Sequence, residues 1–442
     1  MLQHRVHYNY IYTRRIRVEL TIKRTLLIIR IFVVLVTYFI TAVISKFFRK
    51  RKIAPRTIIF SISANQIWKD STPGDLKSIL SETRFAQYFS IENSIWQVRS
   101  LNFNRYFRNE IVFDAARYIL INCLTWSLFL RILVDSITSV CYKDFDTNKT
   151  STQSLIEELI DGFTWKQFFG SQHSQIELIT TLSSGLKLPI CFREEYAKQT
   201  HRIMLWYSNN SFQITNRHAT VKTQHPLANF SKEIDLNLVW SSSQKRELES
   251  LDLGACQIIG PIHFQKHYDL SVAKEKQSKE LRVAFFDVIP IQHLQLGNFY
   301  SSKACRNNLL STVELLSTVC RSENMNLTFV LKPKREYKLK YHDRAYIELC
   351  TSLAETKKII VEEAQVNLYS FLSGVDLVLG VPFTSPVQLA HHLGIKAAYV
   401  SFESSEWNVS KNLDGIEVLF DLNELELFIR EFFIRSGFQK LV

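Results

Sequence analysis

Short apolar runs alternate with amphipathic segments along most of the chain. In the clearest example, an apolar run at 377–379 ends in a break with glycine and proline at 380–386. A helix-like segment follows as far as Gly394, and a second apolar run covers 395–400. Apolar runs of this length between breakers are typical of buried strands, and strands that alternate with helices form parallel sheets. The pattern therefore predicts a strand–turn–helix–strand unit here.

The same alternation occurs on both sides of Gly260-Pro261, a pair that interrupts regular structure. Ser241 and Gln244 have the spacing of a helix capping box at the start of one predicted helix. The sequence therefore predicts an α/β protein with two Rossmann-like parallel-sheet domains, residues 53–262 and 263–442. The expected strands are 56–63, 188–192, 201–207, 234–240, 256–259, 281–288, 327–331, 358–361, 377–379, 395–400 and 415–420, and the expected helices include 242–251, 309–321, 346–355, 367–374 and 422–433.

The N-terminal arm, residues 1–52, has a different pattern. Leu26–Ser45 is a 20-residue apolar run whose only charged residue is Arg30, and basic residues flank it on both sides. About 20 residues can cross a bilayer core. The run could form a single span, an interfacial helix on anionic lipid, or a buried helix. The flanking charge favours membrane attachment, so we expect a membrane-associated helix that contacts lipid through residues 1–52.

Charge and cysteine content narrow the classes of partner. The net charge is +12, but residues 1–52 hold 12 Lys or Arg and one acidic residue, so the remainder is nearly neutral. A neutral body argues against a nucleic-acid partner. The seven cysteines form no Cys-x-x-Cys pair and no zinc-like cluster with histidine, which fits a reducing compartment and predicts no bound metal.

Pro382-Phe383-Thr384-Ser385 resembles the signature of the bacterial polysaccharide-biosynthesis "PFTS motif" proteins. The resemblance extends to residues 327–335 and to Trp240-Ser241, and it covers roughly residues 200–430. It implies a GT-B-like glycosyltransferase, in which an N-terminal acceptor domain and a C-terminal donor domain face a cleft. In transferases that use CMP-activated acidic sugars, a Thr-Ser or Ser-Ser pair and a His-Pro pair act on the cytidine phosphate. Thr384-Ser385 could correspond to the first pair, whereas the second would fall at Lys332-Pro333.

Polar residues follow several predicted strands of the C-terminal domain, where parallel sheets bind ligands. Each group alone is better explained as a helix cap or a surface turn. Together they provide cations and hydroxyls for a phosphate, a carboxylate for ribose hydroxyls and a wall for a base. The predicted donor-binding residues are Lys332, Lys334, Arg335, Glu362, Phe383, Thr384 and Ser385, and Glu363 adjoins Glu362.

The N-terminal domain should supply the general base that removes a proton from the acceptor hydroxyl. Glu194 and Glu195 follow a predicted strand, and we expect one of them to be this base. Asn209 and Asn210 could bind the acceptor sugar or simply form a turn. The chain has neither a Walker sequence nor a Gly-x-Gly-x-x-Gly loop. Helix N-termini and cations can hold a leaving phosphate, so a metal-independent reaction without a cofactor is expected.

These features predict a glycosyltransferase that moves a sugar from a nucleotide-activated donor, including CMP-activated acidic sugars, to a surface polysaccharide or lipid-linked oligosaccharide. The product would belong to a capsule or lipopolysaccharide, and the enzyme would lie on the cytoplasmic face of the bacterial inner membrane. Two alternatives remain open. One is a phosphotransferase of similar architecture that uses a CDP-activated alditol. The other is a non-catalytic, membrane-tethered protein of polysaccharide assembly.

Overall fold

The structure is a computed structural model of the chain. It describes, with short gaps, residues 152–206, 233–261, 280–290, 301–402 and 412–436, together with residues 56–62, 94–98 and 111–112 and single helical positions within 25–40 and 127–135. By compactness the chain separates into two units, one of which contains Met204–Val442 and two shorter earlier segments. The domain boundary expected at residues 262/263 stays a prediction.

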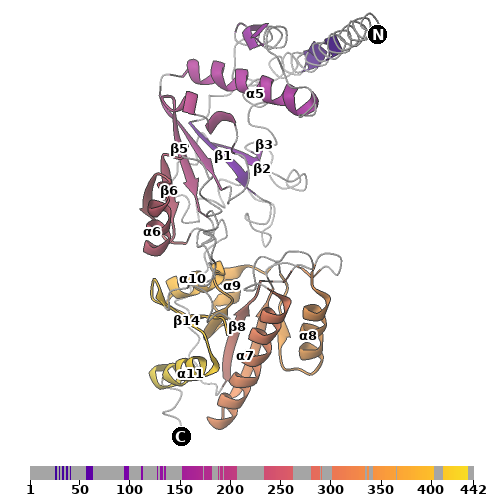
Figure 1. Ribbon diagram of the computed structural model, residues 1–442, viewed down its shortest axis with the longest axis vertical. Helices are drawn as coiled ribbons and strands as arrows, with labels where there is room; N and C mark the ends of the chain where they lie inside the picture. Colours follow the sequence, from indigo (N-terminus) through magenta and orange to yellow (C-terminus); the bar gives the residue numbers. More distant parts are fainter. Residues whose placement is uncertain are drawn as a thin grey trace, which may run out of the picture. The chain divides into compact units, whose positions relative to one another are not determined.

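The first sheet has seven strands in the order β3-β2-β1-β4-β5-β6-β7 (Figure 1). Strand β1 pairs in parallel with β2 and β4, and β6 pairs in parallel with β7. The strands are β1 Thr57–Ile62, β2 Ser94–Val98, β3 Ile111–Val112, β4 Ile176–Thr180, β5 Thr200–Leu205, β6 Leu236–Val239 and β7 Ala255–Ile258.

Among the described residues, α5 (Thr152–Gly170) and α6 (Ser242–Ser250) are the long helices that accompany these strands in the chain. Helix α5 carries buried aromatic rings, and its Phe169 packs on Tyr196 with ring centroids 5.2 Å apart. Ser241 caps α6, because its hydroxyl accepts a hydrogen bond from the Gln244 N–H. The Gln244 side chain in turn accepts from the Trp240 N–H at 2.8 Å. The predicted Ser241–Gln244 capping pair is therefore confirmed, with the return bond one residue earlier than in the standard box.

The second sheet also has seven strands, in the order β10-β9-β8-β11-β12-β14-β13. All neighbouring pairs are parallel except β13 and β14, which are antiparallel. The order of the parallel strands is that of the doubly wound nucleotide-binding fold, and it reverses between β8 and β11. The strands are β8 Glu280–Phe286, β9 Asn326–Lys332, β10 Ile360–Val361, β11 Leu377–Gly380, β12 Lys396–Val400, β13 Asn412–Leu413 and β14 Ile416–Leu419.

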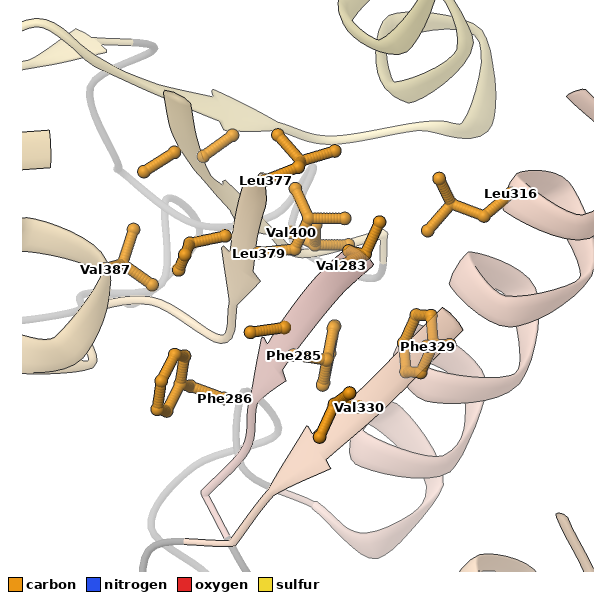
Figure 2. Packing of buried hydrophobic residues seen from close by; sticks show 14 of the residues in the cluster. Val283, Phe285, Phe286, Leu316, Phe329, Val330, Leu377, Leu379, Val387 and Val400 are labelled. Atoms are coloured by element: carbon orange, nitrogen blue, oxygen red, sulfur yellow. The ribbon is translucent and has the colours of Figure 1, made fainter. Parts of the chain in front are cut away.

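Helices cover both faces of the second sheet. Figure 2 shows Leu316 of α7 beside Phe329 on one side of the strands and Val387 of α10 on the other. Successive side chains of β8 point to opposite faces of the sheet. The Phe285 ring stacks on Phe329, whereas the Phe286 ring packs edge to face on Phe371 of α9. The helices are α7 Ser302–Ser322, α8 Arg344–Glu355, α9 Leu368–Leu372, α10 Ser385–His392 and α11 Leu422–Ser436.

Most of the predicted elements are confirmed within a few residues, and the strands form two separate sheets. The strand expected at 188–192 is wrong: Ile190–Phe192 is a 3-10 helix. Pro189 explains the difference, because it has no N–H for a strand ladder and its fixed φ suits a helical turn. The sequence analysis also missed β2, β3, β4 and β13.

The N-terminal arm contains helical positions between residues 25 and 40. Most of the described apolar side chains of this segment are exposed, among them Leu26, Phe32 and Val33, whereas Val36 is partly buried. Within the part of the chain that the structure describes, no helix combines the length and apolar character needed to cross a membrane. The expected membrane contact therefore stays a prediction.

Candidate functional site

Four polar residues from the predicted donor set lie at the carboxyl edge of the second sheet, on both sides of the point where the strand order reverses: Lys332, Glu362, Thr384 and Ser385. Lys332, Phe286, Gly380 and Tyr399 are in register across β9, β8, β11 and β12. Side chains in register on parallel strands point to the same face, so Lys332 lies on the face that α10 covers. Lys332 and Gly380 are two strand spacings apart, about 10 Å. We call this region the strand-end site.

The turn after β11 supplies Thr384 and Ser385. Thr384 occupies the N-cap position of α10, but its side chain makes no cap hydrogen bond. Its Oγ1 atom is buried and has no hydrogen-bond partner among the residues that the structure describes. Ser385 is the first residue of α10 and Pro386 follows it, so the positive end of the helix dipole points into this edge. Thr384 therefore occupies the cap position without capping the helix through its hydroxyl.

Phe383 and Tyr399 hold the turn in place. The Phe383 ring meets the Tyr399 ring edge to face, with centroids 5.5 Å apart. The Tyr399 hydroxyl donates a hydrogen bond to the Thr384 carbonyl oxygen at 3.4 Å. Tyr399 is buried, whereas Phe383 is partly exposed. Strand β12 thereby supports the turn, and the outer part of the Phe383 ring stays available to a ligand.

Lys332, the last residue of β9, is almost fully buried, with 5% of its surface exposed. Its Nζ donates a hydrogen bond to the Glu363 carbonyl oxygen at 2.6 Å, which links the ends of β9 and β10. Burial lowers the pKa of Lys332 from its ordinary value of 10.5 to about 8, and the nearby carboxylates of Glu362, Asp287 and Glu363 oppose this shift. The amine therefore changes its charge close to neutral pH.

Asp287 is a residue of this edge that the sequence analysis missed. It directly follows β8, is 2% exposed, and accepts a hydrogen bond on Oδ2 from the Tyr346 hydroxyl of α8. The predicted donor residues were selected because they are polar and lie close after a buried strand. Asp287 meets the same criterion and could have been identified in this way. Asp343 orders the start of α8, since its carboxylate accepts hydrogen bonds from the Tyr346 N–H and the Ser302 hydroxyl.

The structure gives less information on three other predicted donor residues, Glu362, Lys334 and Arg335. Glu362 is partly exposed at the end of β10, beside Glu363. Lys334 and Arg335 lie outside the described residues. No group of three or more His, Cys, Asp or Glu side chains is placed to hold a metal ion within the described ranges.

The predicted base and acceptor residues belong to the first half of the chain. Glu194–Tyr196 forms a 3-10 helix that comes before β5, and Glu195 is exposed. The Ile176 N–H bonds to the Gln199 carbonyl oxygen, so this segment adjoins the amino end of β4. Glu194 and Glu195 therefore do not follow a strand, which was the reason for selecting them. Asn209 and Asn210 lie outside the described residues.

Comparison with solved structures finds distant similarities. The glycosylation-associated Gap123 complex of Streptococcus agalactiae matches at 14% identity and TM-score 0.37, over 64% of this chain and 53% of that one. TarM of S. aureus, in a complex with UDP, matches at 11% and 0.37, over 63% and 55%. This chain thus spans about half the length of both. The wall teichoic acid polymerase TagF matches at 10% and 0.42, over 95% and 90%. At TM-scores below 0.5, these similarities establish no shared activity.

No curated protein matches the chain. Residues 149–429, more than half of the chain, match the sequence profile described as polysaccharide biosynthesis PFTS motif protein. The matched range includes β11, the Pro382–Ser385 turn and α10, which form the strand-end site. The chain belongs to the polysaccharide biosynthesis PFTS motif family.

Proposed function

We propose that this protein is a GT-B-like glycosyltransferase that binds a nucleotide-activated sugar at the strand-end site. One observation carries the proposal: the buried Thr384 hydroxyl, which has no partner among the described residues, lies at the start of α10 where the strand order reverses. Open α/β sheets bind ligands at such a reversal, and a helix N-terminus favours an anionic group. The membership of a polysaccharide-biosynthesis family agrees with a sugar donor.

Each residue of the donor site has a proposed role. Thr384, Ser385 and the start of α10 bind the donor phosphate, and the Lys332 ammonium shares its charge. Lys334 and Arg335 extend the basic character of the β9 end, Glu362 binds ribose hydroxyls, and Phe383 packs on the base. About 10 Å separates Lys332 from Gly380, so an anionic ligand between β9 and α10 would connect groups that do not touch each other.

The reaction needs an acceptor hydroxyl and a base. We propose that Glu194 or Glu195 removes the hydroxyl proton while the acceptor oxygen bonds to the anomeric carbon of the donor sugar, and that the bond from this carbon to the oxygen of the nucleotide phosphate breaks. The phosphate leaves with the electron pair, and the strand-end site stabilises its charge without a metal. Asn209 and Asn210 would bind the acceptor, a polysaccharide or lipid-linked oligosaccharide of a capsule or lipopolysaccharide.

We further propose that residues 1–52 attach the enzyme to the cytoplasmic face of the bacterial inner membrane. Most of the described apolar side chains of this arm are about half exposed, for example Leu26 at 55% and Val33 at 56%. Basic residues flank the apolar run. Apolar side chains beside Lys and Arg favour binding to an anionic lipid surface.

The donor class can be tested with the full chain by thermal denaturation in the presence of a CMP-activated acidic sugar, UDP-sugars or CDP-glycerol. A ligand at 100 times its Kd adds about 2.7 kcal/mol to the free energy of unfolding. We expect a nucleotide sugar to raise the melting temperature of the wild type and of Ser373→Ala, whose exposed serine lies at the end of α9, and to have a smaller effect on Ser385→Ala.

The other outcomes separate the alternatives. Stabilisation by CDP-glycerol alone would replace the glycosyltransferase with an alditol phosphotransferase. If none of the nucleotides stabilises the protein, the proposal is wrong and the non-catalytic assembly protein is favoured. Equal stabilisation of Ser385→Ala and wild type would show that the nucleotide binds elsewhere.

A further inference from the structure

Asn367, the N-cap residue of α9, has a buried side-chain amide of which only the oxygen is used. The residue is 2% exposed. Its Oδ1 accepts hydrogen bonds from the Tyr369 N–H at 2.9 Å and from the Ser370 N–H at 3.1 Å. These two donors fix the orientation of the amide, because an NH2 group in place of Oδ1 could not accept them. The Nδ2 atom is buried and has no hydrogen-bond partner among the residues that the structure describes.

Asn367 belongs to the short turn between β10 and α9, and contacts on both strands of this edge hold the turn in place. The Glu363 carbonyl oxygen accepts hydrogen bonds from the Val366 N–H at 3.3 Å and from Lys332 Nζ, at the end of β9, at 2.6 Å. Glu362 lies at the start of the same turn, and its Oε1 accepts from the Glu363 N–H at 3.1 Å. The Asn367 amide and the Glu362 carboxylate therefore belong to one turn that is anchored on β9.

Helix α9 connects this turn to the region of α10. One helical turn after Asn367, Phe371 packs edge to face on Phe286 of β8, with ring centroids 5.8 Å apart. The Phe286 carbonyl oxygen in turn accepts a hydrogen bond at 3.0 Å from the Val381 N–H, at the beginning of the turn that carries Thr384. The end of β8 thus lies between the Asn367 turn and the Thr384 turn. Two strand spacings separate β9 from β11, so the two turns are roughly 10 Å apart.

This spacing selects the kind of ligand group that can reach Asn367. A phosphate at the start of α10 is too small to extend to the β10–α9 turn, whereas the ribose of the same nucleotide lies beyond its phosphate. A ribose hydroxyl donates one hydrogen bond and accepts others. The Glu362 carboxylate is an acceptor only, and the Asn367 NH2 group is a donor only. One hydroxyl therefore satisfies both residues.

We propose that Asn367 is a further donor-binding residue, whose Nδ2 donates a hydrogen bond to the ribose hydroxyl that Glu362 binds. The inference rests on the proposed function, because it takes the ligand to be a nucleotide with its phosphate at the start of α10. It adds a specificity: the site selects ribonucleotides over nucleotides that lack this hydroxyl, because a missing hydroxyl leaves the buried amide without a partner.

Asn367→Ser separates ligand binding from helix capping. Serine caps a helix about as well as asparagine does, so the variant keeps the cap and loses only the amide donor. Asn412→Ser is the matched control. Asn412 is exposed in β13, and its Oδ1 accepts from the Gly415 N–H in the hairpin before β14, at the opposite edge of the sheet.

The test measures the Kd of the full chain for CMP and UMP and for their 2′-deoxy and 3′-deoxy forms by calorimetry. We expect the wild type and Asn412→Ser to bind a ribonucleotide about 3-fold to 10-fold more tightly than the form that lacks the recognised hydroxyl. In Asn367→Ser the Kd of the ribonucleotide should rise by about the same factor, and the Kd of that deoxy form should stay unchanged. A purely structural role of Asn367 would instead weaken all of these nucleotides together.

Three results would overturn the inference while CMP or UMP binding still supports the donor site. They are equal affinity of the wild type for the ribose and both deoxy forms, an unchanged ribose preference in Asn367→Ser, and an equal loss of affinity for all forms in that variant. If neither CMP nor UMP nor their deoxy forms bind the wild type, the proposed donor site is wrong and the role of Asn367 fails with it.

Folding of the variant has its own check. If Asn367→Ser does not fold, Asn367→Thr replaces it in the same measurement, because threonine also caps a helix and fills more of the vacated space. Failure of both variants to fold would show that the NH2 group supports the fold itself, and would overturn the inference.

Discussion

A Cβ atom on Gly380 would lie 2.8 Å from Thr384 Oγ1. The same position is 2.6 Å from Val387 Cγ2 and 3.0 Å from the Phe286 carbonyl oxygen. Gly380 is the last residue of β11, and the absence of a side chain lets the turn and the first residues of α10 approach the sheet closely. The glycine before the Pro382–Ser385 turn thus determines where the Thr384 hydroxyl lies.

We expect Gly380→Ala to lower the free energy of unfolding, by about 1–3 kcal/mol, because the added methyl group overpacks a site bounded partly by backbone. Gly162→Ala is a matched control, since a Cβ at Gly162 in α5 meets nothing within 4 Å. That control should be neutral or stabilising by up to about 1 kcal/mol. Chemical denaturation of the three proteins measures both effects. An unchanged stability of Gly380→Ala would mean that α10 does not pack on β11 as described.

Thr384→Val separates a ligand-binding role from a structural one. Valine has nearly the same shape and removes a buried hydroxyl that has no partner among the described residues, so the melting temperature should stay the same or rise. If the hydroxyl binds the donor phosphate in the transition state, the transfer rate should fall about 10-fold to 100-fold. This fall corresponds to an activation free energy that is higher by about 1.4–3 kcal/mol.

The control for Thr384→Val is Thr351→Val, which replaces an exposed threonine of α8 and should leave the transfer rate unchanged. A lower melting temperature of Thr384→Val with normal turnover of the folded fraction would show that Thr384 has only a structural role. The donor phosphate would then have to bind elsewhere.

The stability of the protein should rise between about pH 8 and pH 10. The pKa of Lys332 is about 8 in the folded chain and 10.5 ordinarily, so in this range the unfolded chain binds more protons than the folded chain. The free energy of unfolding therefore increases as the pH rises from about 8 towards 10.5, and this contribution is constant below about pH 8, where both states are protonated. The difference between wild type and Lys332→Met isolates this contribution, with an upper limit of about 3 kcal/mol. Parallel stability curves for the two proteins would contradict the pKa shift.

Deletion of residues 1–52 should release the protein from the membrane fraction of cells. A full-length variant with Leu26, Phe32 and Ile40 replaced by serine keeps every basic residue and tests the apolar contribution alone. We expect weaker membrane binding of this variant and greater sensitivity to salt, because only the electrostatic attraction remains. If the shortened chain sediments with membranes as the full chain does, the attachment site is elsewhere.

Local sequence signals predicted most of the elements that carry the strand-end site. The apolar run at Leu377–Leu379 and the helix after Pro386 were both predicted, and so was the cap Ser241. These features depend on residues a few positions apart, so they can be read along the chain. Where local signals conflicted, as at the apolar run that contains Pro189, the prediction was wrong.

The tertiary structure decided which strand ends are neighbours. Nothing in the local pattern says that β8 lies between β9 and β11, because strand order depends on how the helices bury both faces of the sheet. That order brings Asp287, Lys332 and Thr384 to one edge. It also buries Lys332 beside carboxylates, which changes its pKa in a way that its place in the sequence does not reveal. The sequence by itself determined the elements and the polar residues at their ends, and packing determined which of those residues act on one another.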